Sequence, residues 1–214
     1  MIRVILADDH SVIRDGLKLI LSDTDDLVVC GDAANGAQLL GLLSQQDCDL
    51  LVVDISMPGR NGLELIKIIR KERSHLPILV LSMHPEAQYA LRALRAGASG
   101  YVTKDSGSAM LLAAMRKVAS GGVYLSDATA EILVRDRWSA PDDDLPHESL
   151  SDRELEIFEM IIAGRKPIDI ATELDLSIKT VSTHKTSILK KMGMTSEAEM
   201  VRYAMLRHLG ALPE

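Results

Sequence analysis

The first 120 residues alternate between short apolar runs and longer segments whose apolar residues recur three and four positions apart. Continuous apolar runs are typical of strands buried on both faces, and the longer spacing is typical of helices with one buried face. Five such repeats predict a five-stranded parallel sheet, doubly wound by helices in the flavodoxin-like manner. The five runs are IRVILA (2–7), LVVCGD (27–32), DLLVVD (49–54), PILVLS (77–82) and GYVT (100–103).

The pattern changes after residue 121. Residues 135–149 read RDRWSAPDDDLPHES, without a sustained period, so we expect a linker over 122–148 that includes a short helix anchored by Trp138. Four helical patterns follow, the first opened by a capping box from Ser151 to Glu154. They predict a small all-α domain over 149–214, after a first domain over 1–121. The four helical segments are 151–164, 167–176, 177–192 and 196–209.

Composition fits two folded domains. The chain has 214 residues, of which 47% are hydrophobic and 26% charged, the balance of a globular protein with a sizeable core. We find no export signal and no apolar run long enough to cross a bilayer, and therefore expect a cytoplasmic protein that does not enter the membrane. Cys30 and Cys48 have no metal-ligand spacing, so we expect two small core residues.

Three carboxylates follow two of the predicted strands. VILADDH places Asp8 and Asp9 after the first strand, and DLLVVD places Asp54 at the end of the third. At a separation of roughly 4 Å each ionised pair would repel by about 4 kcal/mol. A hard divalent cation removes that repulsion, so these residues predict a Mg²⁺ site. The fourth strand ends in Ser82 and Lys104 lies just beyond the fifth; the two would complete a site for phosphoryl transfer, with Asp54 as nucleophile.

These motifs resemble the receiver domains of two-component response regulators over residues 1 to about 121. The resemblance rests on DDH, DISMPGRNG, the Ser82 position and GASGYVTKD. It implies that Asp54 accepts a phosphoryl group from a sensor histidine kinase. It also implies that Lys104 contacts the phosphate, and that Ser82 and Tyr101 reposition as a switch pair. The implied Mg²⁺ ligands are Asp8, Asp9, Asp54 and the main-chain carbonyl of Ser56. His10 and His84 are expected to be bystanders.

The second domain carries a cationic helix within an acidic protein. The net charge is −7, yet residues 176–196 contain four lysines and no acid. In SIKTVSTHKTSILKKM, an apolar stripe opposes a face of short hydroxyl and lysine side chains, which suits a helix lying in a DNA major groove. The stripe comprises Val181, His184, Ile188 and Met192. The expected DNA contacts are Lys179, Thr180, Ser182, Thr183, Lys185, Thr186 and Lys190.

The motifs LSDRELEIFEMIIAG and DIATELDLSIKTVSTHKTSILKKM resemble the LuxR/NarL-type effector domain. The resemblance implies a four-helix helix-turn-helix module in which Ile178 to Met192 reads double-stranded promoter DNA. It also implies that the last helix, Glu197 to His208, supports a homodimer. RNA polymerase is a further candidate partner. The two resemblances together point to a response regulator of the NarL/FixJ type.

We therefore expect a phosphorylation-controlled transcription factor and no turnover enzyme. A phosphatase of the haloacid-dehalogenase type also uses a strand-end aspartate with Mg²⁺, but it typically carries a second aspartate two residues on, where this chain has Ser56. An adaptor acting through protein contacts is the other rival. A sensor of apolar signalling molecules is disfavoured by the aromatic content of 3%. The sequence names neither the kinase nor the target promoters.

Overall fold

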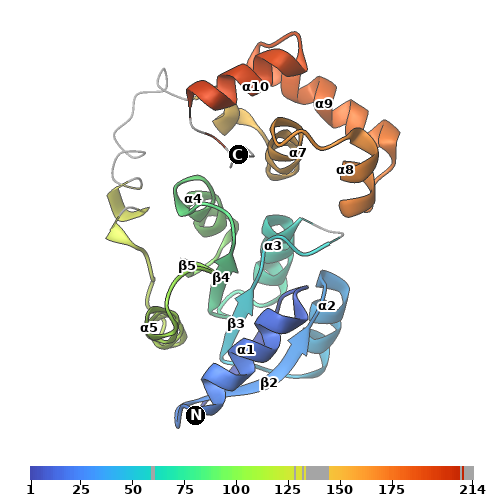
Figure 1. The fold of residues 1–214 in the computed structure, drawn as a ribbon. Helices are drawn as coiled ribbons and strands as arrows, with labels where there is room; N and C mark the ends of the chain where they lie inside the picture. The colour runs from blue at the N-terminus through green and yellow to red at the C-terminus, as the bar shows by residue number, and fades with distance from the viewer. Residues whose placement is uncertain (59–60, 128, 132, 134–144, 208, 210–214) are drawn as a thin grey trace. The chain divides into compact units, whose positions relative to one another are not determined.

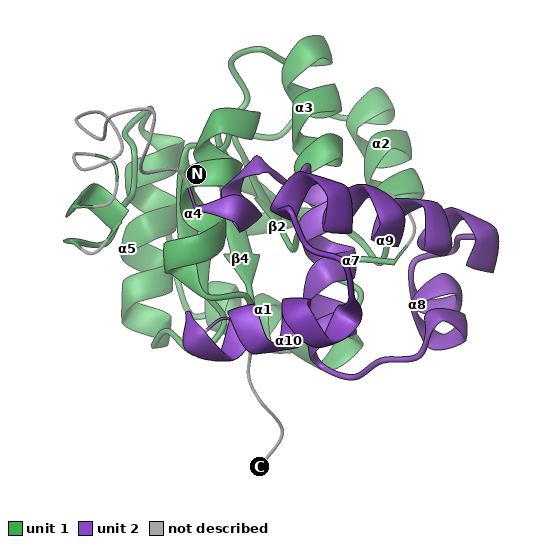
Figure 2. Cartoon of the chain, turned by 90° about the horizontal axis from the view of Figure 1, so that it is seen from above, with its two compact units in different colours: residues 1–138 green, residues 139–214 purple. Residues whose placement is uncertain are grey.

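A computed structural model describes the chain at residues 1–58, 61–127, 129–131, 133, 145–207 and 209. Trp138 and the other linker residues at 128, 132 and 134–144 lie outside these residues. The chain divides into two compact units, residues 1–138 and 139–214, coloured separately in Figure 2. Each unit is described by itself. None of the described helices is long and apolar enough to cross a membrane.

The first unit is a five-stranded parallel sheet with helices on both faces, as the sequence predicts (Figure 1). The strand order is β2-β1-β3-β4-β5. The strands are β1 (Ile2–Ala7), β2 (Leu27–Ala33), β3 (Leu50–Val53), β4 (Ile78–Ser82) and β5 (Gly100–Thr103). The helices are α1 (Ser11–Ser22), α2 (Gly36–Gln45), α3 (Gly62–Glu72), α4 (Glu86–Ala96) and α5 (Ser108–Ala119).

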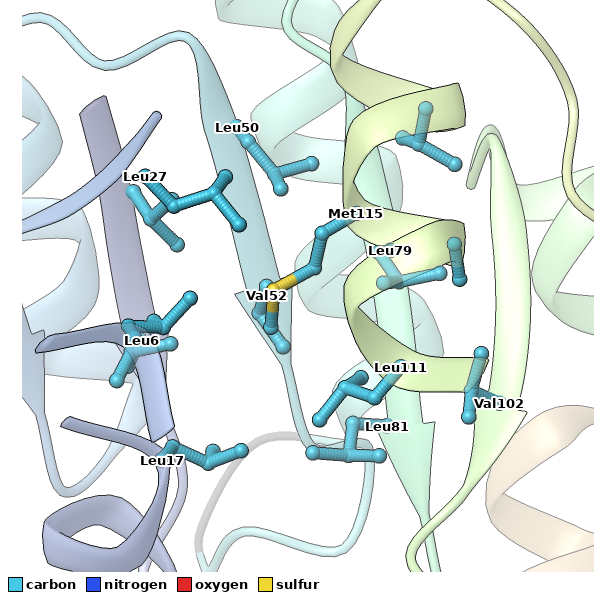
Figure 3. Packing of buried hydrophobic residues seen from close by; sticks show 14 residues of the cluster. Leu6, Leu17, Leu27, Leu50, Val52, Leu79, Leu81, Val102, Leu111 and Met115 are labelled. Atoms are coloured by element: carbon cyan, nitrogen blue, oxygen red, sulfur yellow. The ribbon is translucent and has the colours of Figure 1, made fainter. Parts of the chain in front are cut away.

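Alternate strand side chains supply the two core layers. Leu6, Val52 and Leu81 point toward the face covered by α1 and α5, where Met115 lies among them (Figure 3). The intervening strand residues face α2, α3 and α4, because successive side chains of a strand point to opposite faces. Both layers are buried, which explains why the strands read as continuous apolar runs.

Strand order reverses between β1 and β3, the point at which ligand crevices open in doubly wound sheets. The loop after β3 is pinned there by the start of α3. A Cβ on Gly62 would lie 2.3 Å from Cα of Ile55, so only glycine allows this approach. The side chain of Asn61 caps α3 by accepting a hydrogen bond from the Leu63 amide at 3.0 Å.

The chain remains attached to the first unit beyond α5. The amide of Tyr124 donates to the Ser99 carbonyl at 3.0 Å, and Tyr124 forms an isolated bridge with Gly100. Thr129 is 1% exposed and donates its hydroxyl hydrogen bond to Glu86 at the start of α4. The first part of the segment expected to be a linker thus packs against the sheet edge and α4.

The second unit is the small all-α bundle that the sequence predicts. It contains a short 3-10 helix, η2 (Pro146–Ser149), followed by α7 (Asp152–Ile162), α8 (Pro167–Glu173), α9 (Ile178–Met192) and α10 (Glu197–Leu206). The capping box from Ser151 to Glu154 is formed. The turn between α8 and α9 contains Asp175 at a φ of 52°, a conformation that aspartate tolerates better than most residues. The core is built from Leu155, Phe158, Ile170, Val181, Ile188 and Met200.

Candidate functional site

The structure brings the predicted acidic residues together at the strand reversal. Asp8 and Asp9 follow β1 and Asp54 follows β3, and one ligand atom from each, together with one from His10, lies within 4.8 Å of the others. Asp8 is 3% exposed and Asp54 is 1% exposed, whereas Asp9 is partly open to solvent. The pocket therefore has two buried carboxylates and one at its mouth.

Lys104 bridges the two buried carboxylates. Its Nζ lies 2.5 Å from Oδ2 of Asp54 and 2.7 Å from Oδ2 of Asp8, and its side chain is 3% exposed. Burial alone would lower the pKa of this ammonium, but its hydrogen bonds to Asp54 and Asp8 outweigh burial and raise the pKa. Lys104 is thus charged, and it neutralises one of the three negative charges. The remaining two negative charges would balance those of a divalent cation.

Backbone amides fix the orientation of both buried carboxylates. Oδ1 of Asp54 accepts a hydrogen bond from the amide of Ser56 at 2.8 Å, and Oδ1 of Asp8 accepts one from the amide of His10 at 2.8 Å. These bonds hold the Asp8 side chain against the β1–α1 turn and that of Asp54 against the β3–α3 loop. Their Oδ2 atoms are left to face Lys104.

The predicted switch residues meet through the main chain of His84. Ser82 is completely buried, and its Oγ accepts a hydrogen bond from the His84 amide at 3.2 Å. Tyr101 is 1% exposed, and its hydroxyl donates to the His84 carbonyl at 2.9 Å. The His84 ring stacks on Tyr89 of α4, with centroids 4.3 Å apart. His84 is therefore a junction between Ser82 and Tyr101. Its sequence position gave no sign of this, because both bonds use backbone atoms.

His10 is also more involved than its sequence position suggests. Its Nδ1 lies 2.9 Å from Oδ1 of Asp9 and 3.3 Å from Oδ1 of Asp8. The ring is largely exposed, so it forms part of the pocket's rim. The two cysteines lie elsewhere: Cys30 and Cys48 are free and only half-buried. Burial raises the pKa of the Cys48 thiol to about 11, which keeps it protonated and unreactive.

Helix α9 has the two faces that the sequence predicts. Val181, Ile188 and Met192 are buried, while Ser182 and Thr183 are exposed, as is Thr186. The three exposed hydroxyls each donate to a carbonyl one turn earlier, at 3.0 Å. Because a hydroxyl has two acceptor lone pairs, these side chains still offer acceptors to a ligand. The hydroxyl of Thr180 instead lies 2.7 Å from that of the capping Ser177.

The four lysines of α9 fall into two groups. Lys179 and Lys190 are exposed. Lys185, an expected DNA contact, is paired with Glu197 at the start of α10, with Nζ to Oε1 at 2.6 Å. Lys191 is paired with Glu154, with Nζ to Oε2 at 2.6 Å. Tertiary contacts thus occupy half of the cationic side chains on this helix.

Glu154 joins the start of α7 to the second half of α9. Its carboxylate is 5% exposed and accepts hydrogen bonds from Lys191 at 2.6 Å, from the hydroxyl of Ser187 at 2.6 Å and from the amide of Ser151 at 2.8 Å. Burial would raise the pKa of this carboxyl, but the three hydrogen bonds outweigh it and lower the pKa to about 2. The capping box was evident in the sequence, whereas the contact with α9 was not.

Comparison with known proteins agrees with the description of both units. Residues 4–116 match the response regulator receiver domain, and residues 148–204 match the luxR family of bacterial regulatory proteins. The oxygen regulatory protein NreC of Staphylococcus carnosus is 35% identical over 97% of this chain and 98% of that protein. NreC of Staphylococcus aureus is 36% identical with the same coverage.

Among solved structures, RcsB from Salmonella enterica bound to promoter rprA with the phosphomimetic BeF3- has a TM-score of 0.67 and 26% identity, covering 96% of this chain and 99% of that one. ChrA, the response regulator of a heme-sensing two-component system, has 32% identity and a TM-score of 0.51, and the match covers 97% of this chain and 98% of ChrA.

A parallel sheet with a carboxylate pocket, followed by a helix-turn-helix unit, defines a two-domain signalling regulator. The chain belongs to the response regulators of the NarL/FixJ type, which pair a receiver with a LuxR-type DNA-binding domain.

Replacing Glu154 by Gln should lower stability by on the order of 3 kcal/mol at pH 7, since the native pKa of about 2 lies below the ordinary value of 4.5. A carboxyl whose folded pKa is lowered stabilises the fold above its unfolded pKa. That contribution is lost as pH falls through the folded pKa. The difference between wild type and Glu154→Gln should therefore shrink between about pH 4.5 and 2.

Urea unfolding followed by circular dichroism at several pH values measures this difference. Glu173→Gln, at the exposed end of α8, is the matched control and should change stability little. A Glu154→Gln penalty that stays constant from pH 7 to pH 3 would show that packing, and not the carboxylate charge, carries the effect.

Proposed function

We propose that this regulator is controlled by phosphorylation of Asp54 by a sensor histidine kinase. The observation that carries the proposal is the position of Asp54: its carboxylate is buried at the carboxyl end of β3, with Lys104 Nζ 2.5 Å away and Asp8 beside it. A carboxylate held against an ammonium is poised to attack phosphorus, because the ammonium offsets the charge that gathers on the phosphoryl oxygens.

In the proposed reaction an oxygen of Asp54 forms a bond to the phosphorus of the donor phosphohistidine. The phosphorus–nitrogen bond breaks, and the imidazole leaves with its electron pair. Lys104 remains protonated throughout and contacts a phosphoryl oxygen. Ser82, completely buried at the end of β4, is positioned to donate a hydrogen bond once its hydroxyl turns from His84 toward the phosphate. Such a turn would release the Ser82 link to His84.

The pocket suits Mg²⁺ as a cofactor. Three carboxylates and one ammonium leave two negative charges, and the donors are hard oxygens. Asp8, Asp9, Asp54 and the main-chain carbonyl of Ser56 are the residues that would hold the ion. When bound, Mg²⁺ would offset the charge of the phosphoryl oxygens. Ser56 stands where a dehalogenase-type phosphatase would need its acid, so this chain lacks the group for rapid turnover.

Asp54→Asn should abolish phosphoryl uptake from acetyl phosphate, since an amide oxygen is a poor nucleophile. Asp9→Ala should retain the acceptor but raise the Mg²⁺ concentration needed. Intact mass spectrometry after incubation with acetyl phosphate measures uptake, and reduction of the acyl phosphate with borohydride marks the modified residue. Mapping of the mark to any residue other than Asp54 would disprove the assignment.

We further propose that α9 reads promoter DNA from the major groove. The exposed hydroxyls of Ser182, Thr183 and Thr186 form the middle of its polar face, and Lys179 and Lys190 lie toward its ends. Short side chains allow close approach to base edges, and lysines at the ends reach phosphates. Thr180 and Lys185 are secondary contacts, because Ser177 and Glu197 already engage them. Lys185 would reach DNA only by leaving Glu197.

Lys190→Ala should reduce the slope of log affinity against log salt by about one unit while leaving sequence preference unchanged, as expected for a phosphate contact. Lys179→Ala should reduce the slope by a similar amount. Lys191→Ala is the matched neighbour: because Lys191 pairs with Glu154, its loss should reduce stability and leave the slope almost unaltered. Fluorescence anisotropy with a labelled promoter at several salt concentrations measures the salt slope of each variant. An unchanged slope with altered preference would assign base reading to Lys190.

Finally, we propose that phosphorylation acts by promoting a symmetric dimer on DNA. One recognition helix selects only a few base pairs, so two copies on half-sites about one helical turn apart are needed. Helix α10 presents Met205 and Leu206, 50% and 75% exposed, as an apolar surface for such contact. The signal would start at Ser82 and Tyr101, whose shared partner His84 leads directly into α4.

Phosphorylated wild type should show a larger mass in solution and bind promoter DNA roughly 5- to 150-fold more tightly than unphosphorylated protein, corresponding to a coupling of about 1–3 kcal/mol. Asp54→Asn should show neither change. Light scattering and anisotropy measure the two properties on the same samples. If unphosphorylated protein is already a dimer with full affinity, the receiver controls another step, such as contact with RNA polymerase.

A further inference from the structure

Arg14 of α1 connects the acidic pocket to the end of β2. Its side chain is 14% exposed. Nη1 donates to the main-chain carbonyl of Asp8 at 2.5 Å, and Nε donates to Oδ2 of Asp32 at 3.2 Å. The guanidinium donates from two different nitrogens in a fixed planar geometry, whereas the donors of a lysine all lie on one nitrogen. Neither contact is with a carboxylate of the pocket itself.

The carbonyl that Arg14 holds belongs to the peptide group joining Asp8 to Asp9. The other side of Asp8 is also fixed, because its amide donates to the carbonyl of Ala33 at 3.1 Å. Asp32 and Ala33 are both at the end of β2. The backbone that carries the two carboxylates is therefore tied to β2 at one point by the strand ladder and at a second point by Arg14.

We propose that Arg14 is a positioning residue for the cation site, holding the Asp8–Asp9 peptide so that both carboxylates face the pocket. This inference rests on the proposed function, in which Asp8 and Asp9 bind Mg²⁺. Neither hydrogen bond of the Arg14 guanidinium is with the carboxylate of Asp8, Asp9 or Asp54, so Arg14 would not bind the ion itself. It acts through the carbonyl of Asp8.

The charge of Arg14 has the opposite effect on the site. A cation near the pocket repels Mg²⁺, although Asp32 compensates for this charge and is shared with Lys18, whose Nζ lies 3.0 Å from Oδ1. Removing Arg14 therefore weakens Mg²⁺ binding if its hydrogen bond to the carbonyl dominates, and strengthens it if its charge dominates. The sign of the change separates the two roles.

The test is titration calorimetry of the full-length, unphosphorylated chain with MgCl₂. Arg14→Met should weaken Mg²⁺ binding about 10- to 100-fold, the usual cost of removing a group that orients a metal ligand. Arg14→Lys keeps the charge but loses the two-nitrogen contact, and it should weaken binding to a similar degree. Lys18→Met removes the other cation on Asp32 without touching Asp8, and it should leave Mg²⁺ affinity within about twofold of wild type.

A second readout separates positioning from general stability. Acetyl phosphate labelling of Arg14→Lys should need a correspondingly higher Mg²⁺ concentration for half-maximal rate, yet approach the wild-type rate when Mg²⁺ is saturating. Thermal unfolding without Mg²⁺ reports stability independently. Failure of wild type to label would refute the Asp54 proposal while leaving the calorimetric comparison valid.

Three outcomes would overturn the inference. Tighter Mg²⁺ binding by Arg14→Met would show that Arg14 acts only as a charge. Full Mg²⁺ affinity in Arg14→Lys would show that the two-nitrogen contact is not needed. Lower thermal stability of both variants with wild-type Mg²⁺ affinity would make Arg14 a purely structural residue.

Discussion

The organisation of this protein depends on like charges held together at one point of the sheet. Asp8 and Asp54 are almost completely buried beside each other, and a single lysine lies between them. Such an arrangement is costly unless other interactions compensate. Here the compensation comes from Lys104 and from backbone amides directed at each carboxylate. The apolar layers on both sides of the sheet supply the free energy that keeps the strand ends, and hence the charges, in place.

The second unit contains another buried carboxylate paired with a distant lysine, and the comparison is instructive. Glu154 accepts hydrogen bonds from a lysine, a hydroxyl and an amide, and these contacts join α7 to α9, so its role is structural. Asp54 has one amide and Lys104, and its neighbours are further carboxylates. This surplus of negative charge is what would attract a divalent cation in the proposed function.

The surroundings of the pocket also indicate how a local event would spread. Ser82 and Tyr101 come from adjacent strands, yet both bond to the main chain of His84, whose ring packs on α4. The first residue of α4, Glu86, in turn holds Thr129 beyond α5. A displacement of the β4–α4 loop would therefore alter the contact between Glu86 and Thr129, at the start of the segment that leads out of the first unit. This route is the one along which the proposed switch would act.

Periodicity and strand-end chemistry were sufficient to predict the sheet, the helix-turn-helix unit and the acidic cluster, because alternating burial and the meeting of parallel strand ends follow from local sequence. What the sequence left open was how side chains far apart along the chain share their hydrogen bonds. Lys185 and Lys191 look as available for DNA as Lys190, yet Glu197 and Glu154 engage them. His84 forms its contact with Tyr101 through a backbone carbonyl, and Arg14 contacts the main-chain carbonyl of Asp8. Neither contact can be predicted from residue type or spacing. Only the packed structure decides which polar groups find partners, because that depends on distances set by the whole core.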